Sequence, residues 1–493
     1  MMESKPKTLD KRSYHFEVVR PVWLPYNDIS HQLVSSLISQ FGYPISGPKA
    51  QKYAVALASL LKASQSHMLR AKGKRPHYLG IQRKASAWSR YPLVGREISQ
   101  KVVDDFITHF GGQKVEGSGT RGWFQNDEGK WQLDPRMTMY TLDKERIPEQ
   151  LPEARFIEVG RPLVKVNEAE TRPQKRARQG DKLSKGFLND KAAKALDGAA
   201  YRASQRRVQR LNDYYLSHPL ELPNGHAAAS VTRVFHDGRF DAGGRLYGAW
   251  TGLDQKDQRI HCTIDGEPVV EIDIRASQPT LLSSLLGYKL GGLGPGDTWV
   301  DVYGELSGLT NVNHYWTVID DRIDKIELMK RNRNTAKAVI MAVIGSGLPL
   351  KSKAPPEIME KSGLTVSGWN NFRDELLRTV PALNELEPRY DQKGRLDGYI
   401  NGAGFLSYHE SEMTLLTLDR LIEEDIPVFS VHDCIISKVT DAIRTAKVFR
   451  KTINEYCKEL SGLDVMVPLS LTTVSQRIDL LPNEDQIRGE YLN

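Results

Sequence analysis

The chain of 493 residues is 40% hydrophobic and 26% charged, and its formal net charge is +7. This length can bury a large core in two to four domains, and the positive balance fits an anionic partner but is too small to prove one. The three cysteines include no CxxC pair, so neither a disulfide framework nor a structural zinc site is supported. No apolar run approaches membrane length and the amino terminus does not resemble a signal peptide, so we expect a cytoplasmic protein without a membrane partner.

The amino-terminal half begins with helical patterns and continues with strand patterns. Apolar spacing predicts two helices within residues 29–64 and a third helix that ends at the glycine pair Gly111-Gly112. Residues 113–124 and 131–142 then look like two strands joined by a turn. The sequence therefore predicts helices followed by a hairpin.

This order of elements allows two interpretations. A helical segment (residues 1–65) followed by a helix and a basic hairpin (residues 66–150) is typical of a winged helix-turn-helix domain. In that case Arg121 and Lys130 lie on or near the wing and contact DNA. The alternative is a small α+β domain whose hairpin is merely solvated.

Residues 151–230 form a basic connecting region. Its segment 171–185 is polar, basic and expected to be mobile. Residues 201–216 then have the pattern of a helix that carries several arginines on adjoining faces: Arg202, Arg206, Arg207 and Arg210. Such a helix can follow the phosphates of a duplex, or it can be an ordinary solvated surface helix.

Two aspartates lie on predicted strand edges in the carboxy-terminal half. Residues 267–274 alternate apolar and polar side chains, which predicts a strand with Asp273 near its end, followed by a helix over residues 277–287. Residues 426–438 contain two short apolar runs around His432-Asp433, which predicts a hairpin with Asp433 at its bend. A lone aspartate in a turn is usually only a turn former, but a second one at a strand end makes that explanation insufficient.

A helix with a cationic face is predicted between the two aspartates. In residues 331–345, Arg333, Lys337 and Met341 follow at four-residue intervals and share one face, while the apolar residues of the other faces anchor the helix. An ordinary amphipathic helix with a solvated basic end is the alternative. Nucleotidyl transfer requires two carboxylates that hold a pair of divalent metals about 4 Å apart. It also requires cations that neutralise a triphosphate.

These motifs together resemble those of a known superfamily. Val431-His432-Asp433 resembles the third signature of family A DNA polymerases and of the single-subunit RNA polymerases of phages and mitochondria. Asp273-Ile274 is similar to their first signature, and the helix with Lys337 to their second. The segment Asp241–Tyr247 matches the DxxGRxY element of the RNA polymerases. The resemblance covers roughly residues 233–475 and implies an α+β right-handed polymerase fold, with palm and fingers in residues 231–493 and thumb-like helices in residues 151–230.

The resemblance implies a role for each matching residue near the chemistry. Asp273 and Asp433 are expected to be catalytic metal ligands, with the backbone carbonyl of Ile274 as a further contact. The implied cofactor is a pair of Mg²⁺ ions, for which Mn²⁺ can substitute. Lys337 is expected to hold the triphosphate and protonate pyrophosphate. The other expected nucleotide-binding residues are Arg333, Met341, Gln278 and Gly345.

A second group of residues is expected to bind nucleic acid. Arg245 and Tyr247 belong to the DxxGRxY element, where Gly243 and Gly244 permit close approach. His432 is expected beside the end of the primer or transcript. The segment 406–413 resembles a helix that lines the primer–template minor groove, and His409 and Glu410 are its candidate contacts.

The chain departs from the superfamily at the positions that govern sugar choice. Five residues after the first aspartate, the DNA polymerases have Glu and the RNA polymerases have Gly, whereas this chain has Gln278. The second signature normally ends in Tyr-Gly, but here the tyrosine is replaced by Ile344. These departures leave the choice between ribonucleotides and deoxyribonucleotides open.

Three functions are compatible with these observations. The first is a primase or small single-subunit RNA polymerase that makes RNA on a DNA template from nucleoside triphosphates, in the replication or transcription of a phage or plasmid. The second is a family A-like DNA polymerase of a mobile element. The third is a non-catalytic DNA-binding replication or regulatory protein, which has no need to keep both aspartates. Further expected partners are an RNA or DNA primer or product and a helicase or other replisome protein.

Overall fold

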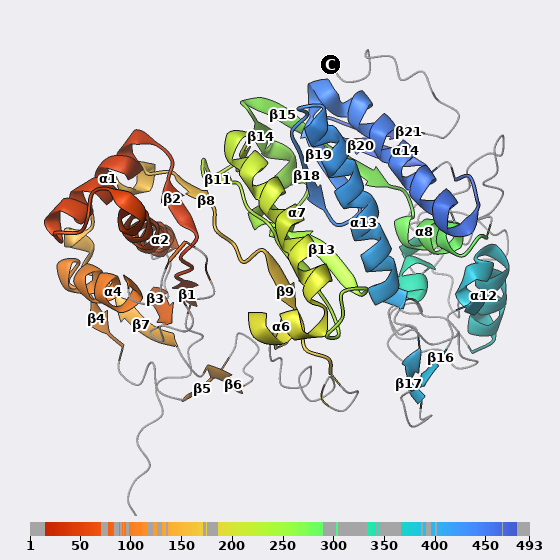
Figure 1. Ribbon diagram of the computed structural model, residues 1–493, viewed down its shortest axis with the longest axis horizontal. Helices are drawn as coiled ribbons and strands as arrows, with labels where there is room; N and C mark the ends of the chain where they lie inside the picture. The colour runs from red at the N-terminus through yellow and green to blue at the C-terminus, as the bar shows by residue number, and fades with distance from the viewer. Residues whose placement is uncertain are drawn as a thin grey trace, which may run out of the picture. The chain divides into compact units, whose positions relative to one another are not determined.

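The protein is described by a computed structural model (Figure 1). It describes residues 15–70, 77–82, 88, 91, 93–94, 98–115, 122–125, 131–134, 137–170, 174, 186–288, 302–303, 333–334, 336–341, 344, 366–385, 388–390, 396–399, 402–465 and 467–480. The chain divides into two compact units, which are residues 1–232 with 248–252 and residues 233–247 with 253–493. The basic segment 171–185 lies outside the described residues, apart from Gln174.

The first unit combines helices with short strands. Its α-helices are α1 (Asp28–Gln40), α2 (Gly47–Arg70), α4 (Ile98–His109), α6 (Asp190–Leu196) and α7 (Gly198–Ser217). Its strands are β1 (His15–Val18), β2 (Trp23–Pro25), β3 (His77–Gln82), β4 (Gln113–Lys114), β5 (Gly122–Gln125), β6 (Trp131–Asp134), β7 (Met137–Thr141), β8 (Phe156–Glu158), β9 (Val164–Val166), β10 (Leu220–Glu221) and β11 (Ala227–Ala228). Its 3₁₀ turns within the described residues are Lys144–Arg146, Leu151–Glu153 and Ala249–Gly252.

Helix α2 is the centre of the first unit. It packs against α1, α4 and the strands β1, β2 and β3, and its residues Val55–Leu61 are almost completely buried. One continuous hydrophobic cluster runs from Val19 to Phe156. The predicted helices of this region and the helix over residues 201–216 are confirmed as α1, α2, α4 and α7.

The strands of the first unit are shorter than the sequence predicts. Residues 113–124 and 131–142 each contain two strands, and these belong to two sheets: β5 pairs with β6, whereas β4 and β7 join β3 and β1. Pro135 lies between β6 and β7 and has no N–H to donate, and Gly117-Ser118-Gly119 separates β4 from β5. Apolar alternation alone does not detect such breaks.

The second unit contains both aspartates. Its strands are β12 (Thr232–Phe235, whose first residue belongs to the first unit), β13 (Gly243–Tyr247), β14 (Thr263–Ile264), β15 (Glu267–Ile274), β16 (Pro388–Tyr390), β17 (Leu396–Tyr399), β18 (Val428–Val431), β19 (Cys434–Lys438), β20 (Leu469–Thr472) and β21 (Arg477–Leu480). Its α-helices with defined bounds are α8 (Ser277–Leu285), α12 (Val366–Thr379), α13 (Gly402–Glu423) and α14 (Ala442–Ser461). Its 3₁₀ turns are Arg259–His261, Pro381–Glu385 and Val439–Asp441.

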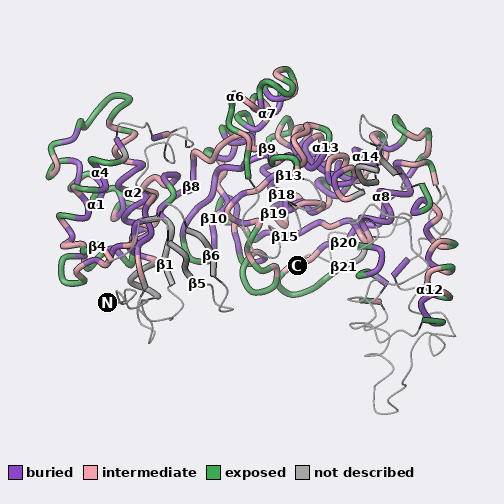
Figure 2. The backbone as a smooth tube through the Cα atoms, turned by 90° about the horizontal axis from the view of Figure 1, so that it is seen from below, coloured by how far each residue is buried: buried purple, intermediate pink, exposed green. Residues whose placement is uncertain are grey.

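An antiparallel sheet forms the centre of the second unit. Its strands follow the order β18-β19-β15-β20-β21, so β15 lies between β19 and β20. Helix α14 packs on β15, β19 and β20, and α13 packs on β13, β18 and α14 (Figure 1). Figure 2 shows β18 and β19 as buried segments, in agreement with the near-complete burial of their apolar residues. This packing fixes the strand ends that carry the aspartates.

The predicted elements around the aspartates are confirmed. The strand over residues 267–274, the helix that follows it and the hairpin of β18 and β19 are all present. The mixture of helices and strands agrees with the predicted α+β class at that coarse level. In the described part of the chain, no helix combines the length and the apolar character that crossing a membrane requires.

Candidate active site

The sheet brings the two aspartates together. Asp273 pairs directly with Cys434 across β15 and β19, and Asp433 is the residue before Cys434. The bend places His432 at φ +58°, a left-handed conformation that costs a non-glycine residue about 1–3 kcal/mol. Burial, followed by the nearby charges of Asp433 and Glu271, raises the pKa of Asp273 to about 8. The two carboxylates therefore repel each other, and a bound cation would reduce this repulsion.

A third carboxylate lies beside Asp273 on β15 and is already neutralised. Glu271 precedes Asp273 by two residues on the same face of β15 and is 1% exposed. Arg259 binds Glu271 through both Nε and Nη2, and Gln255 donates a further hydrogen bond. The buried thiol of Cys434 lies 3.9 Å from the Glu271 carboxylate. The sequence shows Glu271 on this face but gives no sign of its pairing with Arg259.

A second buried ion pair links β13 to α13. Arg245 donates to both carboxylate oxygens of Glu410, at 2.6 and 2.8 Å, and Glu410 is 1% exposed. Gln278 at the start of α8 donates to the same carboxylate at 3.2 Å. Burial, followed by the charge of Asp433, raises the pKa of Glu410 to about 7, while Arg245 opposes this rise. Three predicted site residues thus share one hydrogen-bonded cluster near Asp433.

His432 and Tyr247 also meet at this cluster. Their rings are in edge-to-face contact, with centroids 5.5 Å apart and an interplanar angle of 68°. The hydroxyl of Thr414 on α13 donates to the backbone carbonyl of His432 at 3.2 Å. Burial, followed by the charge of Arg245, lowers the pKa of His432, so the imidazole is neutral at pH 7. Its Nδ1 is buried without a hydrogen-bond partner among the described residues.

The predicted cationic helix has the expected faces. Residues 333–334, 336–341 and 344 are helical where described, with Val339, Ile340 and Ile344 completely buried. Met341 is 41% exposed and Lys337 is exposed. Arg333 lies over the ring of Tyr303 at 5.4 Å. Lys337 is close enough to Asp273 for its charge to favour the ionised carboxylate.

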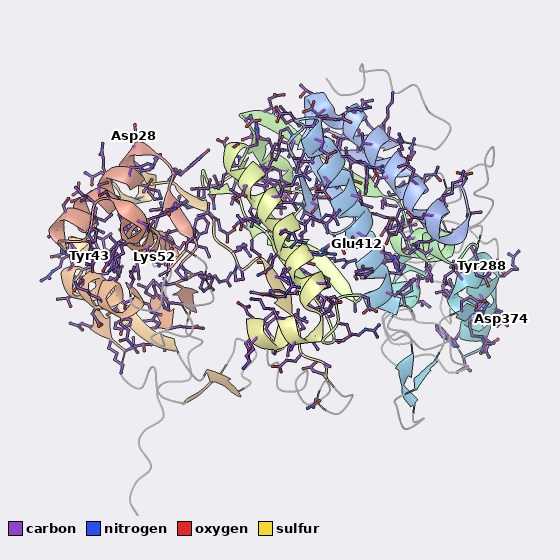
Figure 3. The ribbon with its side chains drawn as sticks, in the orientation of Figure 1. Asp28, Tyr43, Lys52, Tyr288, Asp374 and Glu412 are labelled. Atoms are coloured by element: carbon purple, nitrogen blue, oxygen red, sulfur yellow. The ribbon has the colours of Figure 1, made fainter. Side chains whose placement is uncertain are left out.

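The two neighbouring candidates on α13, His409 and Glu410, contact different residues of the protein. Glu410 contacts Arg245, but His409 accepts or donates a hydrogen bond at 2.8 Å with the hydroxyl of Tyr456 on α14. Figure 3 labels a further acidic residue of this helix, Glu412, which binds Arg233. Each of these polar residues of α13 therefore has a protein partner.

The backbone conformation and the packing of the protein require both glycines of the DxxGRxY element. Gly243 and Gly244 have φ of +81° and +83°, where side chains are strained. A Cβ at Gly243 would lie 2.3 Å from the ring of His236, and one at Gly244 would lie 2.9 Å from the hydroxyl of Ser411. The close approach that the structure shows is thus between β13 and its own neighbours.

The remaining predicted site residues divide into two groups. The side chain of Ile274 is 4% exposed, and this residue pairs with Leu469 of β20. Arg121, Lys130 and Gly345 lie outside the described residues. Besides the residues around Glu271, Arg477 of β21 was not predicted near the aspartates, and its charge also favours the ionised form of Asp273.

The aspartate pair is suitable for a divalent metal. Carboxylate oxygens are the preferred ligands of hard cations such as Mg²⁺, and a cation would relieve the repulsion that, after burial, raises the pKa of Asp273. Among the described residues no cluster of three or more acidic, cysteine or histidine side chains is placed to hold a metal. The arginine bound to Glu271 explains why that carboxylate adds no third ligand here.

Comparisons with known proteins give little further information. No family model and no curated protein match the chain. One similar solved structure is the POL domain of Pol1 from M. smegmatis in complex with DNA primer-template and dNTP, with a TM-score of 0.32 and 12% identity. The match covers 58% of this chain and 55% of that one, which is little more than half of each. A TM-score this low does not establish a shared fold.

Proposed function

We propose that the protein is a template-directed nucleotidyltransferase that makes RNA on a DNA template, as a primase or a small RNA polymerase. The observation that carries this proposal is the pairing of β15 with β19, which sets Asp273 beside Asp433. The charges of Lys337 and Arg477 reach Asp273 from two separate elements. The transfer of a nucleotidyl group requires acidic residues that bind metal ions, next to cations that bind phosphate.

Each residue is assigned a role that fits its position. Asp273 and Asp433 hold two Mg²⁺ ions, with the backbone carbonyl of Ile274 as a further contact. These ions, when bound, neutralise the reacting phosphate and lower the pKa of the attacking hydroxyl. Lys337 binds the triphosphate and gives a proton to pyrophosphate, and Arg333 binds the outer phosphates. Lys337 is exposed, so its side chain can meet a nucleotide, whereas Arg333 is half-buried and lies over the ring of Tyr303.

The cluster around Glu410 defines one wall of the proposed nucleotide site. Because Arg245 and Gln278 both donate to Glu410, they hold this carboxylate and the start of α8 in a fixed arrangement. We assign Gln278 to the sugar of the nucleotide, and His432 and Tyr247 to the end of the growing strand. In the first unit, a winged helix around α4 with Arg121 and Lys130 is assigned to DNA.

Strand synthesis on single-stranded DNA tests this proposal. The wild-type protein, Asp433→Asn and the control Asp464→Asn are compared with Mg²⁺, with rNTPs or dNTPs, and with or without a primer. Asp433→Asn keeps the shape of the side chain but removes its charge, so synthesis should fall at least about 10³-fold, the scale of losing an essential catalytic group. Asp464 is a surface residue bound to Lys458, and its variant should behave as wild type.

Each result has a definite meaning. RNA products without a primer, lost only in Asp433→Asn, support the proposal. Products made only from dNTPs on a primer would assign the chain to DNA synthesis instead. Absence of products in wild type, with DNA binding retained, would favour the non-catalytic DNA-binding alternative. Circular dichroism of both variants distinguishes lost chemistry from lost folding.

A further inference from the structure

A cavity of about 280 Å³ lies where the turn between β12 and β13 meets the first turns of α13. The turn and the helix both belong to the second unit, and α13 packs on β13 (Figure 1). The described residues that line the cavity include neither Asp273 nor Asp433. They include charged residues of the turn and aromatic residues of the helix: Asp237, Arg239, Asp241, Phe405, Tyr408 and His409.

The imidazole of His409 is fixed in the wall of this cavity through one of its two nitrogens. Its Nδ1 lies 2.8 Å from the hydroxyl of Tyr456 on α14. Burial raises the pKa of Tyr456 and lowers the pKa of His409, so the phenol keeps its proton and the imidazole is neutral at pH 7. Because this hydroxyl has no other acceptor among the described residues, we infer that it donates to Nδ1, which leaves the ring proton on Nε2.

The Nε2–H of His409 is available to a ligand. This atom has no hydrogen-bond partner in the described part of the chain. It is also absent from the buried polar atoms that lack a partner there, so solvent reaches it. The histidine lines the cavity and is half-buried. The cavity therefore contains an oriented, uncharged hydrogen-bond donor.

Flat side chains surround this donor. Phe405 lies one helical turn before His409, and their rings meet edge to face with centroids 4.4 Å apart. Phe405 is half-buried and has no other ring contact among the described residues, so aromatic surface remains for a ligand. On the turn, Arg239 donates from Nε and Nη2 to the two carboxylate oxygens of Asp241, which holds its planar guanidinium at the cavity.

This set of groups is suited to an unstacked nucleobase. Proteins bind such bases by stacking them on Phe, Tyr, His or Arg and by hydrogen bonds to the polar edges of the base. The charged residues of the lining are two aspartates and one arginine, which disfavours a phosphate group. The Nε2–H presents a positive hydrogen, which disfavours a cation. A neutral, planar ligand with hydrogen-bond acceptors on its edge fits both conditions.

We propose that this cavity binds one unpaired nucleobase, which stacks on Phe405 and accepts a hydrogen bond from Nε2 of His409. The base belongs to a single strand of nucleic acid or to a free nucleotide, and the inference rests on the proposed function for this choice of ligand. A duplex does not offer such a base, because its bases are paired and stacked on one another. This role for His409 differs from the minor-groove contact that the sequence predicts.

Binding of matched probes to four variants tests the inference. The variants are His409→Ala, His409→Gln, Phe405→Leu and the control His261→Ala, which removes an exposed histidine of the same unit. The probes are fluorescein-labelled single-stranded oligo(dA), the same strand with abasic residues, a blunt oligo(dA)·oligo(dT) duplex, and AMP. Dissociation constants are measured in EDTA, by fluorescence anisotropy for the DNA probes and by calorimetry for AMP. Circular dichroism checks the fold of each variant.

His409→Ala and Phe405→Leu should each weaken binding of oligo(dA) or of AMP about fivefold or more, the scale of one lost base contact. A loss confined to oligo(dA) assigns the base to a strand, and a loss of AMP affinity assigns it to a nucleotide. His409→Gln should recover part of the loss, because its amide also donates a hydrogen bond. If the base belongs to a strand, the abasic strand should bind wild type and His409→Ala equally, because no base is left to contact.

The inference and the proposed function can fail separately. If the wild type synthesises strands, and His409→Ala and Phe405→Leu match His261→Ala for every probe, the base site is wrong and the function stands. If the wild type is inactive but both variants weaken oligo(dA) or AMP, the base site stands and the function is wrong. If His409→Ala weakens the duplex or the abasic strand as much as oligo(dA), the contact is with the nucleic-acid backbone, and the inference is overturned.

Discussion

At the scale of single residues, the aspartate pair makes the protein sensitive to pH. A carboxyl group whose pKa is higher in the folded state binds its proton more tightly there than in the unfolded chain. Its contribution to stability is therefore complete below the unfolded pKa of about 3.9 and declines as pH rises toward the folded value. For Asp273 that value is about 8. The repulsion between the two carboxylates is greatest when both aspartates are ionised.

We predict that the metal-free protein loses stability as pH rises from about 4 to about 8. Asp273 accounts for at most about 1.4 kcal/mol per pH unit. Urea denaturation in EDTA at several pH values should show this loss in wild type, and Asp273→Asn should flatten the dependence. Added Mg²⁺ should stabilise the wild type more at pH 8 than at pH 5. Parallel pH curves for the two proteins would contradict the prediction.

At the scale of elements, the ion pair of Arg245 and Glu410 joins β13 to α13. Arg245→Ala leaves the buried carboxylate of Glu410 without its cation, so the free energy of unfolding should fall by about 3–5 kcal/mol. The double variant Arg245→Met with Glu410→Leu should recover much of that loss, because apolar replacement removes both charges. Urea denaturation measures both effects.

A matched control is available on the surface. Arg444 of α14 binds Glu424, the residue after the end of α13, through a similar two-pronged contact, but this pair is exposed to solvent. Arg444→Ala should change stability far less, because water screens the pair and solvates the remaining charge. If Arg245→Ala and Arg444→Ala lowered the free energy of unfolding equally, burial would not be the reason that the Arg245 pair stabilises the protein.

The elements around the site could be predicted because their patterns are local. Alternation over residues 267–274 requires only neighbouring residues, and so does the four-residue spacing that places Lys337 and Met341 on the exposed face of their helix. The bend at Asp433 follows from two apolar runs interrupted by polar residues. In each case one short segment contains all the information.

The contacts of the site could not be predicted because they join distant segments. Glu410 was expected to meet nucleic acid, but in the structure its carboxylate binds Arg245, 165 positions away in the chain. Arg477 approaches Asp273 only because β20 and β21 pair beside β15, and no periodicity of the sequence shows strand order. Register and strand order, rather than element type, decide which charges meet.

At the scale of the whole molecule, the two compact units have different chemical character. The aspartates, the cationic helix and the cluster around Glu410 all belong to the second unit. The first unit has its own continuous core from Val19 to Phe156 and includes the short segment 248–252. Trp250 of that segment is completely buried and packs edge-on against Tyr215. The chain thus returns once to the first unit after β13, so a truncation at residue 232 would remove part of the core of that unit.

The assignment of the first unit to DNA predicts that this unit contributes to DNA affinity through the hairpin of β5 and β6, which Arg121 and Lys130 adjoin in the sequence. Each Lys or Arg that neutralises a phosphate adds about 0.9 to the slope of log affinity against log salt on duplex DNA. The double variant Arg121→Ala with Lys130→Ala should therefore lower DNA affinity and reduce this slope by up to about 2. The matched control Lys49→Ala with Lys144→Ala removes two exposed cations from the same unit and should leave the slope nearly unchanged. Because both variants lose the same net charge, a general electrostatic effect would lower their slopes equally, and that result would remove the hairpin from the DNA-binding surface.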